Sequence, residues 1–442
     1  MKRNLKEFTV NFSKSLKISS ILKSISGKSD FAKDAITLTI GTSIAQFVPI
    51  LFYPILTRVF TPAEFGLLAT LTSITSILVV ISTGKYENSI LIADSKVDAA
   101  NIITLVFLLS IVLLTISSVI LQIFSFKLGQ YVNEPSLQKW IIICPISALF
   151  IIIYNCYNEW CVRNKYFNIL AINKIVNSAA TTFSKLLFGI LRVINNGLVI
   201  GDLLGRFISA MGCIYRGWKR DKSTFLQITY PKMQYLLKKY IDFPRLILPG
   251  QLLNIIGGSI PVFLIGAYFN KSEVGYYAIS MNVLGIPISV ISRAIQDVFR
   301  QRANEEFITY GRCDKILLRI LKILIIWIVI GVGLLFFIIP EIFSFVLGES
   351  WRIAGEYSQI LLPMMAIDFI AVSLSGVFII TNKLSIELFW QIYYVGISII
   401  SFIIGYLLFH DIKSCLIFFS TGRATAYFLE IFLSFKYSKG VK

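Results

Sequence analysis

Twelve long apolar stretches dominate this sequence, each about 20 residues or more in length. A helix needs about 20 residues to cross a hydrocarbon core about 30 Å thick, so each stretch is long enough to span a bilayer. Lipid offers no hydrogen-bond partners, which favours helices because they satisfy their own backbone. The chain is 56% hydrophobic and 15% charged, whereas soluble domains are nearer 25% charged. We therefore predict an all-α integral membrane protein. The predicted spans are 34–57, 63–84, 99–125, 139–162, 168–191, 194–215, 246–268, 274–299, 317–340, 355–381, 384–409 and 411–434.

The basic residues indicate how these spans are oriented. With the N-terminus placed inside, most of the 42 lysines and arginines fall in alternate loops and at both termini. An excess of lysine and arginine marks cytoplasmic loops, so we expect both termini to be cytoplasmic. The net charge of +18 would also fit a nucleic-acid partner. Because long uncharged stretches interrupt the basic residues, we expect none.

A short repeat divides the chain into two halves. Residues Phe60 to Ala69 and Phe269 to Ala278 both read F-x3-E-x-G-x2-A, and each follows the first span of a six-span half. Six spans per half give both halves the same orientation, which predicts two six-helix bundles related by a pseudo-two-fold axis along the membrane normal, with a central cavity between them. Alternatively, such Glu-Gly turns only cap helices. The predicted segments are a basic tail at 1–33, bundles at 34–215 and 246–434, a cytoplasmic basic linker at 216–245 and a tail at 435–442.

The basic tail at 1–33 has two interpretations. Its apolar residues recur at near-helical spacing with lysines between them, which is typical of a helix lying on anionic lipid. The alternative is a disordered segment that only enforces topology.

Charged side chains inside spans are the main functional signal, because each is costly in lipid. Lys174, Lys185 and Arg192 are 11 and 7 residues apart, so they share one face of the helix predicted at 168–191 if it continues to Arg192 directly after it. We expect this face to line a cationic cavity and to bind substrate. The alternative is that these cations snorkel to the interface or pair with acids on neighbouring helices.

The remaining intramembrane cations differ in their nearest acids. Arg206 has Asp202 and Arg293 has Asp297 at i,i+4 spacing, which permits a neutral pair within one helix. For both arginines, pairing and substrate contact remain open. Arg423 has no acid three or four residues away, so we expect a free cation there.

Few acids lie within the spans. Asp368 and Glu387 are each either a counter-ion of Arg423 or a protonatable group that couples transport to a proton gradient. The six cysteines lack metal-type spacing and there is one histidine, His410. We therefore expect no metal site, no cofactor and no catalytic group, and we leave open whether transport is coupled to protons or sodium.

Several motifs resemble a known family. They are Phe60-Thr-Pro-Ala-Glu-Phe-Gly-Leu, Ser82-Thr-Gly-Lys-Tyr-Glu-Asn-Ser-Ile, Val274-Gly-Tyr-Tyr-Ala and Val298-Phe-Arg-Gln-Arg-Ala-Asn-Glu-Glu. They are similar to those of the Wzx-type oligosaccharide flippases of the MOP superfamily. The resemblance implies two six-helix bundles around a central cavity in the bacterial inner membrane. It also implies a cargo, an undecaprenyl-diphosphate-linked oligosaccharide moved to the periplasmic leaflet for O-antigen (lipopolysaccharide) or another surface polysaccharide. Membrane lipids, a polymerase and a chain-length regulator are the implied partners.

The charged residues within the spans and the family resemblance both favour a transporter over an enzyme. Cations in a cavity can replace the hydration of a diphosphate, and Lys185 is the leading contact, followed by Arg206 and Arg423. A MATE-like antiporter of organic cations shares the architecture but should have an acidic cavity. An O-antigen polymerase should have large periplasmic loops and catalytic groups, which the sequence does not suggest.

Overall fold

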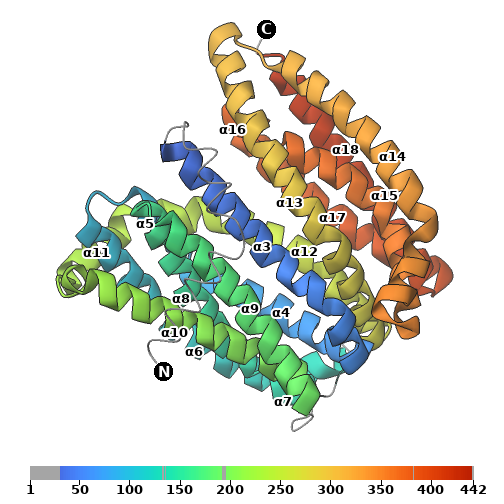
Figure 1. Cartoon of the computed structure of the whole chain (residues 1–442), viewed down its shortest axis with the longest axis horizontal. Coiled ribbons are helices and arrows are strands. Elements are labelled where there is room, and N and C mark those ends of the chain that lie inside the picture. The colour runs from blue at the N-terminus through green and yellow to red at the C-terminus, as the bar shows by residue number, and fades with distance from the viewer. Residues whose placement is uncertain (1–29, 132–133, 135, 192–195, 382, 441–442) are drawn as a thin grey trace.

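The computed structural model describes the chain except for residues 1–29, 132–133, 135, 192–195, 382 and 441–442. All regular elements in the described part are helical (Figure 1). The twelve long helices are α3 (Asp30–Val59), α4 (Pro62–Thr83), α6 (Lys96–Tyr131), α8 (Ile143–Arg163), α9 (Phe167–Leu191), α10 (Gly197–Phe225), α12 (Leu248–Tyr268), α13 (Lys271–Tyr310), α14 (Asp314–Leu347), α15 (Arg352–Leu374), α17 (Leu384–Phe409) and α18 (Ile412–Ser438). The short elements are η1 (Tyr86–Asn88), α5 (Ser89–Ile92), α7 (Leu137–Trp140), α11 (Tyr230–Lys239), η2 (Phe243–Ile247), η3 (Glu349–Trp351) and α16 (Val377–Ile380). The possible lipid-binding helix of the basic tail lies almost wholly outside the described residues.

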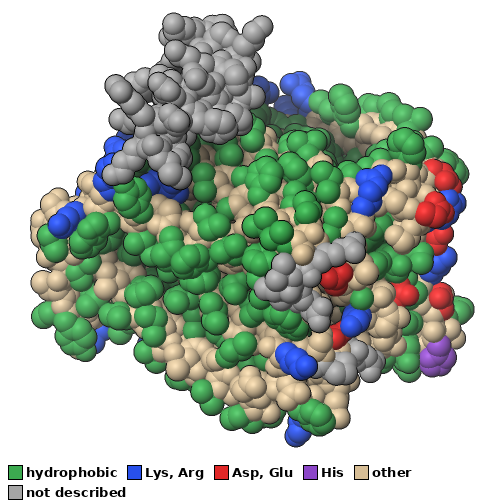
Figure 2. Space-filling view, turned by 60° about the horizontal axis from the view of Figure 1, so that its bottom comes forward, with side chains coloured by type: hydrophobic (Ala, Val, Ile, Leu, Met, Phe, Trp, Pro, Cys, Tyr) green, Lys and Arg blue, Asp and Glu red, His purple; other side chains and the backbone are tan. Residues whose placement is uncertain are grey.

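The twelve long helices match the twelve predicted spans. Among the described residues, ten segments are long and apolar enough to cross a membrane, and the two remaining long helices are α8 and α9. The outer face of α14 shows why lipid must surround the molecule: Trp327, Phe337 and Phe345 are 72%, 77% and 86% exposed. Soluble proteins rarely expose so much contiguous apolar surface. Apolar side chains are likewise spread over the face in Figure 2. The protein is a multi-pass membrane protein.

The helices form two bundles, which Figure 1 shows in blue to green and in yellow to red. In the first, α9 packs on α3 and α10, while α8 packs on α4, α6 and α10. In the second, α17 packs on α12 and α18, while α15 packs on α13, α14 and α18. Counting helices from the start of each half, these neighbour patterns are the same. The predicted pair of six-helix bundles is confirmed.

Residues 216–245 are mostly helical, whereas the sequence predicted only a basic linker there. Helix α10 continues to Phe225, and α11 packs against the end of the first bundle by burying Met233 and Leu236. The Tyr86 hydroxyl donates to the Leu237 carbonyl (3.0 Å), and Lys232 pairs with Asp98 (3.2 Å). This segment is therefore attached to the first bundle.

The two copies of the sequence repeat cap equivalent helices. Thr61 and Glu64 form a reciprocal capping box at the start of α4, with the Thr61 N–H donating to Glu64 Oε2 (2.9 Å). At the start of α13, Asn270 Oδ1 accepts from the Ser272 and Glu273 N–H groups (2.9 and 3.1 Å). Each cap satisfies backbone donors that a helix start leaves unpaired.

These two helix starts also cross each other at a pair of glycines. A Cβ on Gly66 would lie 1.8 Å from the Lys271 carbonyl oxygen, and one on Gly275 would lie 1.9 Å from the Pro62 carbonyl oxygen. The contacts are reciprocal, as a two-fold axis between the glycines requires. Only glycine permits this approach, so the repeat both caps the helices and joins the two bundles.

Candidate functional site

A cavity of about 340 Å³ lies between the two bundles. Its walls come from α3, α4, α9 and α10 of the first bundle and from α12 and α13 of the second. The lining residues are Pro49, Tyr53, Leu56, Phe65, Leu68, Ala69, Thr72, Ser73, Thr181, Thr182, Lys185, Asp202, Arg206, Gly258, Val262, Tyr277, Ala278, Met281 and Asn282. Three of them are charged, and all three belong to the first bundle.

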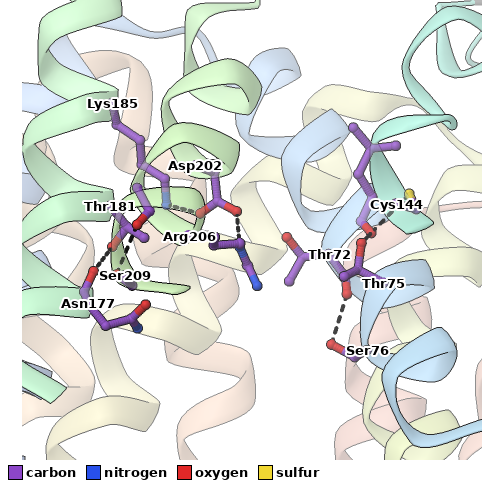
Figure 3. A network of polar contacts seen from close by, with 12 residues as sticks. Thr72, Thr75, Ser76, Cys144, Asn177, Thr181, Lys185, Asp202, Arg206 and Ser209 are labelled. Atoms are coloured by element: carbon purple, nitrogen blue, oxygen red, sulfur yellow. Dashed lines mark hydrogen bonds and ion pairs between the residues drawn. The ribbon is translucent and has the colours of Figure 1, made fainter. Parts of the chain in front are cut away.

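The charged residues form one cluster (Figure 3). Lys185 Nζ lies 2.7 Å from Asp202 Oδ1, and Arg206 Nε donates to Asp202 Oδ2. Asp202 is buried, and both cations are partly buried. Two cations share one carboxylate, so the cluster keeps a formal charge of +1 inside a cavity where water screens charge less than in bulk. The predicted central cationic cavity is confirmed.

Glycines in α10 bring this cluster together. A Cβ on Gly201 would lie 2.5 Å from Lys185 Cα, and one on Gly205 would lie 2.3 Å from Thr181 Cα. Small residues four apart let two helix backbones approach closely in a membrane. The close approach of α9 and α10 places Lys185 beside Asp202.

Replacing Gly205 with alanine is therefore expected to force α9 and α10 apart. Overpacking of this kind costs about 1–3 kcal/mol, so the thermal unfolding temperature in detergent should fall. Gly212→Ala is the matched control on the same helix, because a Cβ there meets only the end of the Arg216 side chain at 3.1 Å. Equal stability of the two variants would contradict the role assigned to Gly205.

Neutral hydrogen-bonding groups line the rest of the cavity. Thr72 and Ser73 come from α4, Tyr53 from α3 and Asn282 from α13. In Figure 3, Thr72 lies on the side towards which the Arg206 guanidinium points. The cavity thus combines one net positive charge with hydroxyl and amide groups, which suits an anionic and polyhydroxylated ligand.

The bundles close one end of the cavity. Trp351 Nε1 donates to the Thr57 carbonyl (2.9 Å), and the Thr57 hydroxyl donates to the Leu347 carbonyl (2.9 Å). The Trp351 ring meets the Phe65 ring edge-on, with centroids 5.2 Å apart. Lys271 adds an ion pair with Glu134 (3.0 Å). These contacts lie at the same end as the glycine crossing.

Lys174 and Arg293 lie outside the cavity lining. The Lys174 ammonium donates to the Thr42 hydroxyl (2.9 Å) and also interacts electrostatically with Arg293 of the second bundle. Arg293 and Asp297 form no ion pair with each other in the described structure, so the intrahelical pair considered for them is absent. The corresponding pair of Asp202 and Arg206 is present. The predicted contact Arg192 lies outside the described residues.

Arg423 corrects one expectation, because it is enclosed within the second bundle and does not line the cavity. It is 3% exposed, its Nε donates to the Ser398 hydroxyl (3.0 Å), and its guanidinium lies 4.5 Å from the centroid of the Tyr394 ring. It also donates to the Gly257 carbonyl. That carbonyl lacks a helical donor, because Pro261 four residues later has no N–H. Arg423 is therefore not a free cation.

Replacing Arg423 with alanine should destabilise the protein. The change removes two hydrogen bonds and the cation–π contacts, for an expected loss of about 3 kcal/mol in the free energy of unfolding. Thermal unfolding in detergent measures this loss, with Lys174→Ala as the control. Unchanged stability together with lost transport would instead identify Arg423 as a substrate contact.

The acids of the second bundle differ in the cations with which they interact. Asp368 interacts electrostatically with Arg423, whereas Glu387 interacts with Arg300. Glu430 on α18, which the sequence analysis missed, is 8% exposed and interacts with both Asp368 and Glu387. Because Glu430 lies near the end of a span, the sequence did not indicate that its side chain is buried. Proton coupling through Asp368 or Glu387 stays a prediction.

The fold and the cavity together define a membrane protein with the architecture of a two-bundle transporter. Residues 55–355 match the model of a family described as polysaccharide biosynthesis protein. The match covers most of the chain, and the protein belongs to this family. No curated protein sequence matches the chain.

Solved structures resemble the chain in fold at low sequence identity. The lipid II flippase MurJ in an inward closed conformation matches with a TM-score of 0.72 and 13% identity, over 91% of this chain and 87% of that one. An outward-facing multidrug resistance MATE transporter of the MOP superfamily matches with a TM-score of 0.62 and 17% identity, over 93% and 95%. A MOP transporter from Pyrococcus furiosus Vc1, whose reversed pocket polarity suggests a different function, matches with a TM-score of 0.56 and 14% identity, over 94% and 98%. The fold predicted from the family resemblance is confirmed.

Proposed function

We propose that the protein is a flippase for a lipid-linked oligosaccharide, with undecaprenyl diphosphate as the lipid carrier. The observation that carries the proposal is the +1 cluster of Lys185, Asp202 and Arg206 in a cavity between two bundles. A diphosphate cannot cross hydrocarbon alone, and the two cations replace part of its hydration. The hydroxyl and amide groups of the cavity accept hydrogen bonds from sugar hydroxyls and donate hydrogen bonds to them.

Movement of the cargo follows an alternating-access scheme in the bacterial inner membrane. The glycine crossing and the Trp351 contacts hold one end closed. The distribution of lysine and arginine supports a cytoplasmic position for the opposite end and for both termini. The prenyl chain stays in lipid while the diphosphate and sugar enter between the bundles. Opening of the closed end then releases the cargo to the periplasmic leaflet, where a polymerase and a chain-length regulator would act.

The polysaccharide family description supports this substrate class. The competing function is that of a MATE-like antiporter, since such transporters share the fold. An organic cation would be repelled by the net positive cluster. The charge of the cavity therefore favours the anionic, lipid-linked cargo.

A gene deletion followed by analysis of lipid-linked intermediates tests the proposal. Loss of surface polysaccharide with single oligosaccharide units retained on the cytoplasmic leaflet is the expected result, and complementation should restore the polymer. Units that reach the periplasmic face but stay unpolymerised would identify a polymerase. Normal polysaccharide with increased sensitivity to organic cations would favour the antiporter.

A further inference from the structure

A second hollow lies on the outside of the first bundle, away from the central cavity. This groove, of about 400 Å³, runs between α6, α8 and α10, and its volume is within the range of ligand pockets, about 300–1,000 Å³. Its floor includes the buried residues Ile152, Cys156 and Cys213. Gly217 keeps the floor open, because a Cβ there would meet the Tyr157 ring at 3.1 Å.

The mouth of the groove faces the surrounding lipid. Phe107, Ile214 and Trp218 line it and are 36%, 48% and 51% exposed. The Thr104 hydroxyl, one of the few polar groups of the lining, donates to the Ala100 carbonyl (3.2 Å) and offers no donor to a ligand. An apolar groove that opens into a bilayer fits a hydrocarbon chain.

A cation lies where the groove meets the end of the span. Lys222 Nζ is 5.7 Å from the centroid of the Trp218 ring, one turn further along α10. No described acid forms a salt bridge with Lys222, and the adjacent Asp221 is already occupied by Lys96 (2.6 Å) and the Trp160 indole N–H (2.9 Å). A lysine beside an interfacial tryptophan is placed to hold a lipid phosphate.

We propose that this groove binds one anionic phospholipid, with an acyl chain between α6, α8 and α10 and its phosphate on Lys222. The site is separate from the central cavity and does not depend on the nature of the cargo. One exposed lysine near the membrane surface contributes about 1 kcal/mol towards anionic lipid, which corresponds to about fivefold selectivity over a zwitterionic lipid.

Lys219 provides a matched control on the same helix. Its Nζ lies 5.9 Å from the centroid of the Tyr215 ring, so it has the same kind of aromatic neighbour. Tyr215 does not line the groove, however. Only Lys222 should therefore matter for lipid selectivity.

Fluorescence quenching by brominated lipids tests the proposal on the full-length protein in phosphatidylcholine vesicles. The difference between wild type and Trp218→Phe isolates the signal of Trp218 from that of the other tryptophans. Half-quenching should need about fivefold less brominated phosphatidylglycerol than brominated phosphatidylcholine. Lys222→Gln should abolish this preference, and Lys219→Gln should retain it. Ile153→Phe, which fills the groove, should also abolish it.

Other outcomes would overturn the site. Equal quenching of the wild type by both lipids would mean that Trp218 contacts only bulk lipid. Equal effects of Lys219→Gln and Lys222→Gln would indicate a diffuse basic surface. A preference that survives Ile153→Phe would mean that the acyl chain does not occupy the groove.

Discussion

Lys185→Ala is expected to reduce transport of the lipid-linked oligosaccharide roughly 30- to 150-fold while leaving folded protein in the membrane. The change removes one of two cations and lowers the formal charge of the cluster from +1 to 0, because Asp202 and Arg206 remain paired. Loss of one close charge partner costs about 2–3 kcal/mol. The initial rate of cargo translocation in reconstituted vesicles measures the effect.

Two variants serve as controls for Lys185. Lys174→Ala removes a cation from the same helix that bonds to Thr42 and does not line the cavity, so it should keep most of the activity. Lys185→Arg preserves the charge and should have a smaller effect than Lys185→Ala. If Lys174→Ala and Lys185→Ala lose transport equally, the cluster is not the anion site.

Gly66→Ala should prevent the two bundles from closing at the glycine crossing. Its Cβ would lie 1.8 Å from the Lys271 carbonyl oxygen, a backbone atom that cannot rotate away. The starts of α4 and α13 must then separate, which weakens the contacts of Trp351 with Thr57 and Phe65. Alternating access needs the closed state, so transport should fall more than about tenfold, a cost above 1.36 kcal/mol.

Distances between spin labels at this end measure the opening. Arg58→Cys and Ser350→Cys place labels on exposed positions of the two bundles, and the native cysteines are buried. Gly66→Ala should shift the distribution to longer distances. Gly333→Ala is the control, because nothing lies within 4 Å of a Cβ there. An unchanged distribution in Gly66→Ala would show that the crossing does not hold the closed state.

The spans could be predicted from the sequence because a bilayer imposes a minimum apolar length. Helix α17 (Leu384–Phe409) has the predicted bounds. Helices α10 and α13 extend about ten residues further than predicted. Their last turns are polar and lie beyond the apolar stretch, where apolar length no longer marks the helix end.

The cavity cluster could be predicted only in part. The i,i+4 spacing of Asp202 and Arg206 fixes their pairing within one helix. The pairing of Asp202 with Lys185 depends on how closely α9 packs against α10. The Gly201-x3-Gly205 pattern in the sequence indicates this close packing, but it did not enter the prediction.

Arg423 shows what local spacing cannot reveal. Its hydrogen-bond partners are a hydroxyl on α17 and a carbonyl on α12, and its guanidinium also lies over the Tyr394 ring of α17 and the Phe419 ring of its own helix. Neither hydrogen-bond partner is an acid and neither lies on α18. A search for acids three or four residues away could not find these partners. Pro261 was the available signal, because a proline has no N–H and leaves the carbonyl four residues earlier without a helical donor.

We propose that the cavity carries an anionic lipid-linked oligosaccharide across the bilayer. The most direct test is translocation of a fluorescent polyprenyl-diphosphate oligosaccharide in vesicles that contain the purified protein, read out with a membrane-impermeant quencher. We expect cargo from the inner leaflet to become accessible to the quencher, and to do so faster with the wild type than with Lys185→Ala. A rate equal to that of protein-free vesicles, together with export of an organic cation by the same preparation, would contradict it.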